Sequence, residues 1–299
     1  MPKVSYDAVP PLISIVIPVR NDAESLARLL AQLSEGGPSV PRAESRGVPP
    51  SDVEIIISTV GDDDQEIRAL SLQRTDLTWV HSTAGRAAQL NAGAAQATGE
   101  WLWFVHADSV LPDGWLEAFR RLDQTGDRQP ETGNRNHNPT GDRQPATGNR
   151  NPIPTGDRQP ATGNRIVGGS FRFALSSPAW QARLIERGVA SRVRWLNLPY
   201  GDQGIFVRRQ VFLAMNGFAP LPLLEDVELI GRLKRLGALR HLTLSLTTSA
   251  RRWERDGWWR RSVGNLAIVS LYWLGVSPER LARRYYRERG HASRRPRCL

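Results

Sequence analysis

The chain has 299 residues, of which 40% are hydrophobic, so it is long enough to bury one large core or two small ones. Its one cysteine, Cys298, excludes an intrachain disulfide framework and is typical of a reducing compartment, which predicts a cytoplasmic protein. The sequence predicts neither a signal peptide nor a membrane span, which needs roughly 18 apolar residues. The net charge of +10 is concentrated in residues 251–299, which hold 13 Arg and 4 acidic residues. A charge so confined argues against nucleic-acid binding by the body of the protein.

The first hundred residues alternate between predicted strands and helices. Asn21 and Glu24 stand at capping-box spacing before a run of leucines, which predicts a helix start. Strand and helix alternation with short connections predicts a parallel, doubly wound α/β sheet. The expected elements are strand, helix, strand, strand, helix and strand, at residues 13–19, 21–33, 53–58, 77–80, 85–97 and 101–105.

The strand expected at 101–105 is aromatic and apolar, and it leads into His106-Ala107-Asp108. Such a run is typical of a buried parallel strand, and open α/β sheets bind their ligands at the carboxyl ends of these strands. A carboxylate at that position can hold a divalent metal on a phosphorylated substrate. The alternative is a solvated Asp108 that caps the next turn.

A repeated segment interrupts the alternation. Thr-Gly-Asp-Arg-Gln-Pro begins at Thr125 and recurs at Thr140 and Thr155, a period of 15 residues. The units lack recurring apolar positions, so they cannot stack around a buried core. We expect residues 124–165 to be a disordered, low-complexity insertion, with a binding arm as the alternative, and structure to resume at Ile166.

The second half resumes the alternation and ends in a basic tail. A helix carrying Val227, Ile230 and Leu233 is expected to begin near Glu225. The tail interleaves Trp253, Trp258, Trp259 and Trp273 with arginines, which suits either peripheral association with an anionic membrane or packing against the protein body. The expected strands and helices are at residues 167–175, 180–196, 204–209, 225–236 and 239–248.

Five segments and one later motif carry a family resemblance. They are Ser14-Ile-Val-Ile-Pro-Val-Arg-Asn21, Gly85-Arg-Ala-Ala-Gln-Leu-Asn-Ala-Gly93, Thr98 to Asp108, Tyr200-Gly-Asp-Gln-Gly-Ile-Phe-Val-Arg-Arg209 and Glu225-Asp-Val-Glu228, followed by Gly275-Val-Ser-Pro-Glu-Arg-Leu-Ala282. Together they resemble family 2 glycosyltransferases of the GT-A fold, from Ile13 to about Tyr286 outside the insertion. The combination of His106-Ala-Asp108, Gly201-Asp-Gln203 and Gly275–Ala282 is similar to a subgroup often named after arsenosugar biosynthesis.

This resemblance implies an inverting enzyme that uses a nucleotide-sugar donor and a metal, Mg²⁺ or Mn²⁺. Residues 12–123 would form the nucleotide-sugar-binding half and residues 166–250 the acceptor-binding half with the catalytic base. Residues 251–299 would form a helical tail. The metal motif of the family is Asp-X-Asp, and here Asp108 matches its second acid while His106 replaces the first.

The resemblance also implies the residues that act on the acceptor. The family places a catalytic Asp in a Glu-Asp pair at the start of a helix, which Asp226 matches, with Glu225 beside it. There the carboxylate would deprotonate the acceptor hydroxyl. Plain helix capping is the alternative for the same pair. Asp202 is expected to orient the acceptor or the base. The acceptor would be a small molecule or lipid-linked.

Nucleotide contacts follow from the same motifs. Pro18, Arg20 and Asn21 match the first nucleotide-contacting turn, and Arg86, Asn91 and His106 match positions near the ribose and diphosphate. Thr59 stands where the family usually has an Asp that contacts the base.

Two other classes of protein stay open. One is a sugar-phosphate nucleotidyltransferase, although the chain lacks the Gly-rich loop that such enzymes carry after the first strand. The other is a non-catalytic protein that associates with membranes or nucleic acid through the tail.

Overall fold

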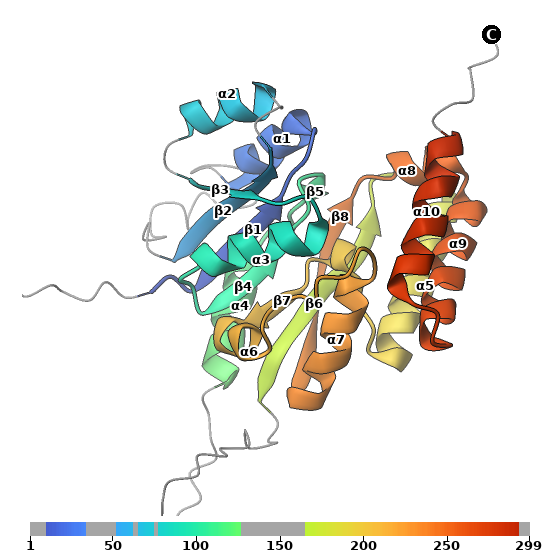
Figure 1. Ribbon diagram of the computed structural model, residues 1–299. Helices are drawn as coiled ribbons and strands as arrows, with labels where there is room; N and C mark the ends of the chain where they lie inside the picture. The colour runs from blue at the N-terminus through green and yellow to red at the C-terminus, as the bar shows by residue number, and fades with distance from the viewer. Residues whose placement is uncertain (1–9, 34–51, 62–64, 75–76, 127–164, 293–299) are drawn as a thin grey trace, which may run out of the picture.

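The computed structural model describes residues 10–33, 52–61, 65–74, 77–126 and 165–292, which form one mixed sheet flanked by helices (Figure 1). The strands are β1 (Ile13–Pro18), β2 (Val53–Val60), β3 (Thr78–Ser82), β4 (Trp101–Phe104), β5 (Ser109–Val110), β6 (Ile166–Leu175), β7 (Phe206–Arg208) and β8 (Ala238–Thr248). The helices are α1 (Ala23–Leu33), α2 (Gln65–Gln73), α3 (Arg86–Gln96), α4 (Trp115–Gly126), α5 (Trp180–Leu196), the short η1 (Gly201–Gln203), α6 (Arg209–Ala214), α7 (Glu225–Leu236), α8 (Arg251–Asp256), α9 (Trp258–Trp273) and α10 (Pro278–Ala292).

The described strands lie in the order β3-β2-β1-β4-β7-β6-β8-β5. β1 pairs in parallel with β2 and β4, and β3 extends this set in parallel beside β2. β7 runs antiparallel to both β4 and β6, whereas β8 is parallel to β6. Because β7 is reversed, its amino end lies at the same edge of the sheet as the carboxyl ends of β4, β6 and β8. The segments that leave β4 and β8 therefore meet the turn that enters β7.

Helices cover both faces of the sheet. Ile15 and Ile17 of β1 pack with α1 and α4 on one face, while Val16 packs with α3 and α7 on the other. This burial on both faces explains why β1 is apolar apart from Ser14. A third cluster joins the end of β6 to α5 and α8.

Aromatic side chains fix β4 against its neighbours. The Trp103 ring stacks on Phe171 of β6 with 4.7 Å between centroids, and its Nε1 donates to the carbonyl oxygen of Gly204 at 3.2 Å. Trp101 meets Phe206 of β7 edge-on at 5.7 Å. Both tryptophans are fully buried, and rings of this size contribute strongly to core stability. They hold the carboxyl end of β4 in a defined position relative to the turn before β7.

The predicted fold class, an α/β mostly parallel doubly wound sheet with a helical tail, is confirmed. β6 begins at Ile166, where the sequence predicts that structure resumes. The predicted insertion at 124–165 falls outside the described residues, apart from the end of α4 and residue 165. α2 and α4 were not predicted, although α4 carries apolar residues at helical spacing.

The predicted cap of α1 is wrong by one residue. Asp22, and not Asn21, accepts the hydrogen bond of the first turn, from the Ser25 N–H at 3.3 Å. Asn21 instead has a φ of 51°, in the left-handed region that Asn tolerates better than most residues. The chain therefore turns at Asn21 before the helix starts.

The basic tail packs on the body of the protein through α8, α9 and α10. Trp253 is buried beside Phe173, with 6.1 Å between ring centroids. Val269 of α9 and Leu281 of α10 belong to the cluster under α3 and α7. No helix in the described part of the chain is long and apolar enough to cross a membrane.

Candidate active site

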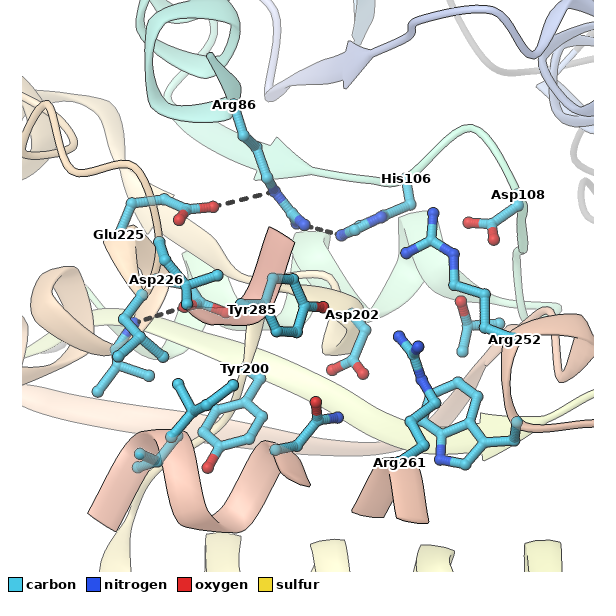
Figure 2. Close-up of a pocket in the computed structure, with 18 of the residues that line it drawn as sticks. Arg86, His106, Asp108, Tyr200, Asp202, Glu225, Asp226, Arg252, Arg261 and Tyr285 are labelled. Carbon is cyan, nitrogen blue, oxygen red and sulfur yellow. Dashed lines mark hydrogen bonds and ion pairs between the residues drawn. The ribbon is translucent and has the colours of Figure 1, made fainter. Parts of the chain in front are cut away.

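A cavity of about 170 Å³ lies at the edge of the sheet where β4 and β8 end (Figure 2). Its walls come from the start of α3, the segments after β4 and β8, the turn before β7, the start of α7, and α8, α9 and α10. This edge is where open α/β sheets bind ligands. The cavity thus gathers all five of the predicted catalytic and metal-binding residues, together with tail arginines. Its charged residues and histidine are Arg86, His106, Asp108, Asp202, Glu225, Asp226, Arg252 and Arg261.

Arg86, the first residue of α3, joins two sides of the cavity. Its Nε lies 3.1 Å from Oε1 of Glu225, and its Nη2 donates to Nε2 of His106. A guanidinium has only donors, so the imidazole accepts at Nε2 and is neutral, with its proton on Nδ1. Burial, and then the charges of Arg86 and Arg252, lower the pKa of His106 well below 6.5. His106 is therefore an uncharged hydrogen-bonding group at neutral pH.

Asp226 is held by backbone donors. The Gly201 N–H donates to Oδ2 at 2.6 Å, and the Val227 N–H donates to Oδ1 at 2.8 Å. Leu224, just before α7, has a φ of 67°, an uncommon conformation for a branched side chain. These contacts fix the orientation of the carboxylate, while its oxygens can each accept a further hydrogen bond.

Gly201 allows Arg86 and Asp226 to approach the turn closely. A Cβ at this position would lie 2.7 Å from Nη2 of Arg86 and 3.2 Å from Oδ2 of Asp226. Both distances are shorter than ordinary contacts, so a larger residue would displace one side chain or both. The glycine in the Gly-Asp-Gln motif is thus explained by packing in the site.

Two further carboxyl groups in the cavity, those of Asp202 and Glu225, have raised pKa values. Burial raises the pKa of Asp202 to about 6, with Arg192 opposing the rise and Asp226 adding to it. Burial also raises the pKa of Glu225, an effect that Arg86 opposes and Asp226 reinforces. Carboxyl groups with raised pKa values in one cavity are typical of sites that transfer protons.

Asp108 and Arg252 face the cavity without fixed partners. Neither side chain makes a hydrogen bond or ion pair with any residue that the structure describes, although the Arg252 charge acts on His106. Arg261 from α9 lies over the Trp253 ring at 4.9 Å and pairs with Asp256 at 3.0 Å. Its buried Nε lacks a hydrogen-bond partner within the described ranges. The unsatisfied cationic donors suit an anionic ligand, whereas the unpaired Asp108 carboxylate suits a cation.

Sequence reasoning missed the contribution of the tail to this cavity. Arg252, Arg261, Asn265 and Tyr285 line it from α8, α9 and α10. The available signal was the interleaving of arginine with tryptophan, because an Arg stacked on a Trp is partly buried and held in place.

The predicted nucleotide-binding residues are only partly brought together. Pro18 lines a small cavity that adjoins the main one and shares Arg86 and His106 with it. Arg20 and Asn21 are exposed beyond the end of β1, and neither lines these cavities. They lie on the turn that precedes α1.

Thr59 and Asn91 are engaged elsewhere. Thr59 is buried, and its Oγ1 lies 3.1 Å from Nδ1 of His81 in β3. Asn91 donates to the Phe218 carbonyl oxygen at 2.8 Å and accepts from the Phe218 N–H at 2.9 Å. The Asn91 amide therefore anchors the segment after α6 to α3.

The residues present fit a metal site of one particular kind. The described residues contain no group of three or more His, Cys, Asp or Glu that could hold a metal alone. Mg²⁺ commonly binds through one or two carboxylates together with substrate phosphates. Asp108 fits such a site as the protein carboxylate. His106 fits only when Arg86 releases its Nε2.

The mostly parallel sheet, with this cavity at the carboxyl edge of its strands, has the GT-A fold. Residues 14–181 match Glycosyl transferase family 2, and the chain belongs to this family. Membership favours a glycosyltransferase over the nucleotidyltransferase considered above. No curated protein matches the sequence.

Solved structures show the same fold at low identity. S. aureus TarS 1-349 in complex with UDP-GlcNAc is 12% identical, with a TM-score of 0.50, and the match covers 79% of this chain and 58% of that one. S. aureus TarS is also 12% identical, with a TM-score of 0.51, over 79% of this chain and 36% of that one. The chain thus spans less than two thirds of the TarS chains that it matches. At this identity the likeness concerns the fold.

Proposed function

We propose that the protein is an inverting, metal-assisted glycosyltransferase that moves a sugar from a nucleotide-sugar donor to a small-molecule or lipid-linked acceptor. One observation carries the proposal: a single cavity holds Asp108, Arg86 and Asp226. Displacement of a nucleoside diphosphate requires neutralisation of the leaving group and deprotonation of the acceptor. The three residues supply a metal-binding carboxylate, a phosphate-binding guanidinium and a base.

Asp226 is the proposed catalytic base. Its carboxylate is held by the N–H groups of Gly201 and Val227, so its position is defined before the acceptor binds. Asp202 and Glu225 line the same cavity and would orient the acceptor and the base. Because the pKa of Asp202 is about 6, its charge changes just below neutral pH. Acceptor orientation would therefore depend on pH in that range.

The diphosphate would bind between Arg86 and the tail arginines. Arg252 has no fixed partner among the described residues, so its guanidinium is free to bind phosphate oxygens in a bidentate manner. Mg²⁺ or Mn²⁺ at Asp108, once bound, would add positive charge at the leaving group. Arg86 would exchange its contact with His106 for the donor, which would also free the imidazole for the metal or the ribose.

The nucleoside would lie toward β1 and β2. Pro18 already lines the adjoining cavity, and we assign Arg20, Asn21 and Thr59 to the nucleotide on the family motif. Asn91 is assigned a structural role because both polar groups of its amide bond Phe218. TarS binds UDP-GlcNAc, so UDP-sugars are the first donors to test.

We further propose that the chain belongs to the subgroup named after arsenosugar biosynthesis and acts in the cytoplasm. The motifs at His106-Ala-Asp108, Gly201-Asp-Gln203 and Gly275–Ala282 support the first statement, and the use of a single cysteine supports the second.

The test compares Asp226→Asn with Asp113→Asn, a matched change at an exposed aspartate outside the cavity. We expect Asp226→Asn to lower the turnover number at least about a hundredfold, as loss of a general base does, while the donor Kd from calorimetry stays within about twofold. Asp113→Asn should match the unmodified protein in both measurements. Retained turnover in Asp226→Asn would refute the assignment of the base.

Metal assistance has its own readout. Chelation with EDTA should abolish transfer, and Mn²⁺ or Mg²⁺ should restore it in the unmodified protein but not in Asp108→Asn. Full turnover in EDTA would refute metal assistance, but it would not contradict the assignment of Asp226 as the base.

A further inference from the structure

Helix α9 presents an apolar stripe to the outside of the protein. The stripe residues recur every three, four or seven positions and therefore share one side of the helix. Each is more than half exposed, which is unusual for large apolar side chains in series. The residues are Trp259, Val263, Leu266 and Trp273.

Helix α5 carries a second apolar stripe beside the first. Trp180, Leu184 and Trp195 fall on one side of α5 and are 62%, 40% and 79% exposed. The rings of Trp180 and Trp259 lie 6.1 Å apart, which joins the two stripes into one surface, called here the α5–α9 face. Figure 1 shows α5 and α9 together at the side of the molecule away from α1 and α2.

The α5–α9 face is also basic. α9 contains two arginines and no acidic residue, and α5 contains four arginines and the single acid Glu186. Glu186 is already paired with Arg183 at 2.9 Å. Arg187, Arg194 and Arg260 are exposed and make no ion pair with any described residue. Apolar side chains flanked by uncompensated arginines suit an interfacial helix on anionic lipid.

The other side of α9 belongs to the cavity. Arg261, Asn265 and Ile268 line the cavity at spacings of four and three residues, which places them on the side of the helix opposite the exposed stripe. A single helix therefore has one side in the candidate active site and one side on the exposed basic face.

We propose that the α5–α9 face docks on an anionic phospholipid surface. The tryptophans and leucines would enter the interface while the arginines contact lipid phosphates. A second copy of the chain fits less well, because a two-fold contact would bring two basic faces together without acidic partners. Docking does not depend on the proposed function. Combined with it, docking brings the cavity near the bilayer and favours a lipid-linked acceptor.

The experiment is sedimentation of the full chain with vesicles. We use phosphatidylcholine vesicles with and without 30% phosphatidylglycerol, at two salt concentrations. The full chain should bind only the anionic vesicles and lose affinity at high salt. Trp259→Ser with Trp273→Ser should lower the affinity at least about tenfold. Arg187→Gln with Arg260→Gln should lower it about 25-fold, or about fivefold per arginine.

A matched control is Leu72→Ser on α2, which removes a leucine that is 74% exposed but lies outside the face. It should bind like the unmodified chain. Equal binding by all variants, or no binding to anionic vesicles, would overturn the proposal. So would a dimer in sedimentation velocity that the same tryptophan and arginine changes abolish, because the face would then be occupied by a second copy. Donor binding by calorimetry in each variant reports separately on the proposed function.

Discussion

Replacing Asp202 with Asn should stabilise the folded protein at neutral pH. The pKa of Asp202 rises from 3.8 to about 6, chiefly because the carboxyl group is buried. The difference between the two values corresponds to about 3 kcal/mol, which is the cost of ionising this group in the folded protein relative to the unfolded chain. Asn has nearly the shape of the protonated acid and carries no charge, so Asp202→Asn removes that cost.

The sign of the pH dependence follows from the raised pKa. Between about pH 4 and pH 6 the folded protein keeps a proton that the unfolded chain has lost, so the unmodified protein loses stability as the pH rises through this window. The advantage of Asp202→Asn should be about 3 kcal/mol at pH 7.5, about 1.6 kcal/mol at pH 5 and about 0.6 kcal/mol at pH 4.

Urea unfolding at these three pH values measures the advantage, with Asp113→Asn as the exposed control. A variant that is less stable than the unmodified protein at pH 7.5, or an advantage that does not change with pH, would refute the reasoning. The first result would mean that the Arg192 and Arg86 charges outweigh the burial of Asp202.

Two further substitutions separate structural roles from binding roles. Gly201→Ala should weaken donor binding about tenfold, because the new Cβ displaces the Arg86 guanidinium, whose hydrogen bonds to phosphate are charge-assisted. The melting temperature should change little, and an unchanged donor Kd would contradict this. Asn91→Ala should lower the free energy of unfolding by about 2 kcal/mol, because two hydrogen bonds to Phe218 are lost. A weaker donor Kd with unchanged stability would instead restore the nucleotide-binding role that the family motif implies.

The sequence predicted those features that depend on local pattern. Helix α5 runs over Trp180–Leu196, and α7 begins at Glu225, as the periodic apolar residues indicate. Residues at the carboxyl end of a buried parallel strand must lie at the ligand-binding edge of the sheet, so Asp108 could be placed without a structure. The assignment of a catalytic role to the Glu225-Asp226 pair came from the family motif, not from any local pattern.

The sequence did not predict features that depend on the packing of distant segments. The ion pair of Arg86 with Glu225 and the entry of Arg261 into the cavity join segments that are far apart along the chain. An arginine in a basic tail has the same local signature whether it faces water or a phosphate site. The tryptophans show the same ambiguity: Trp253 is buried in a core cluster, whereas Trp259 lies on the exposed face.

The chain order of the cavity has a consequence for the synthesis of the protein. The sheet edge with Asp108 and Asp226 is encoded before the helices that complete the cavity, and Tyr285 of α10 is the last residue to join it. At the usual 5–20 residues per second, the stretch from Asp226 to Tyr285, about 60 residues, takes about 3–12 s to translate. During the first part of that interval a nascent chain has Arg86 and the two carboxylates but lacks Arg252 and Arg261. The cavity is therefore synthesised in a fixed order, in which the two tail arginines follow its other charged groups.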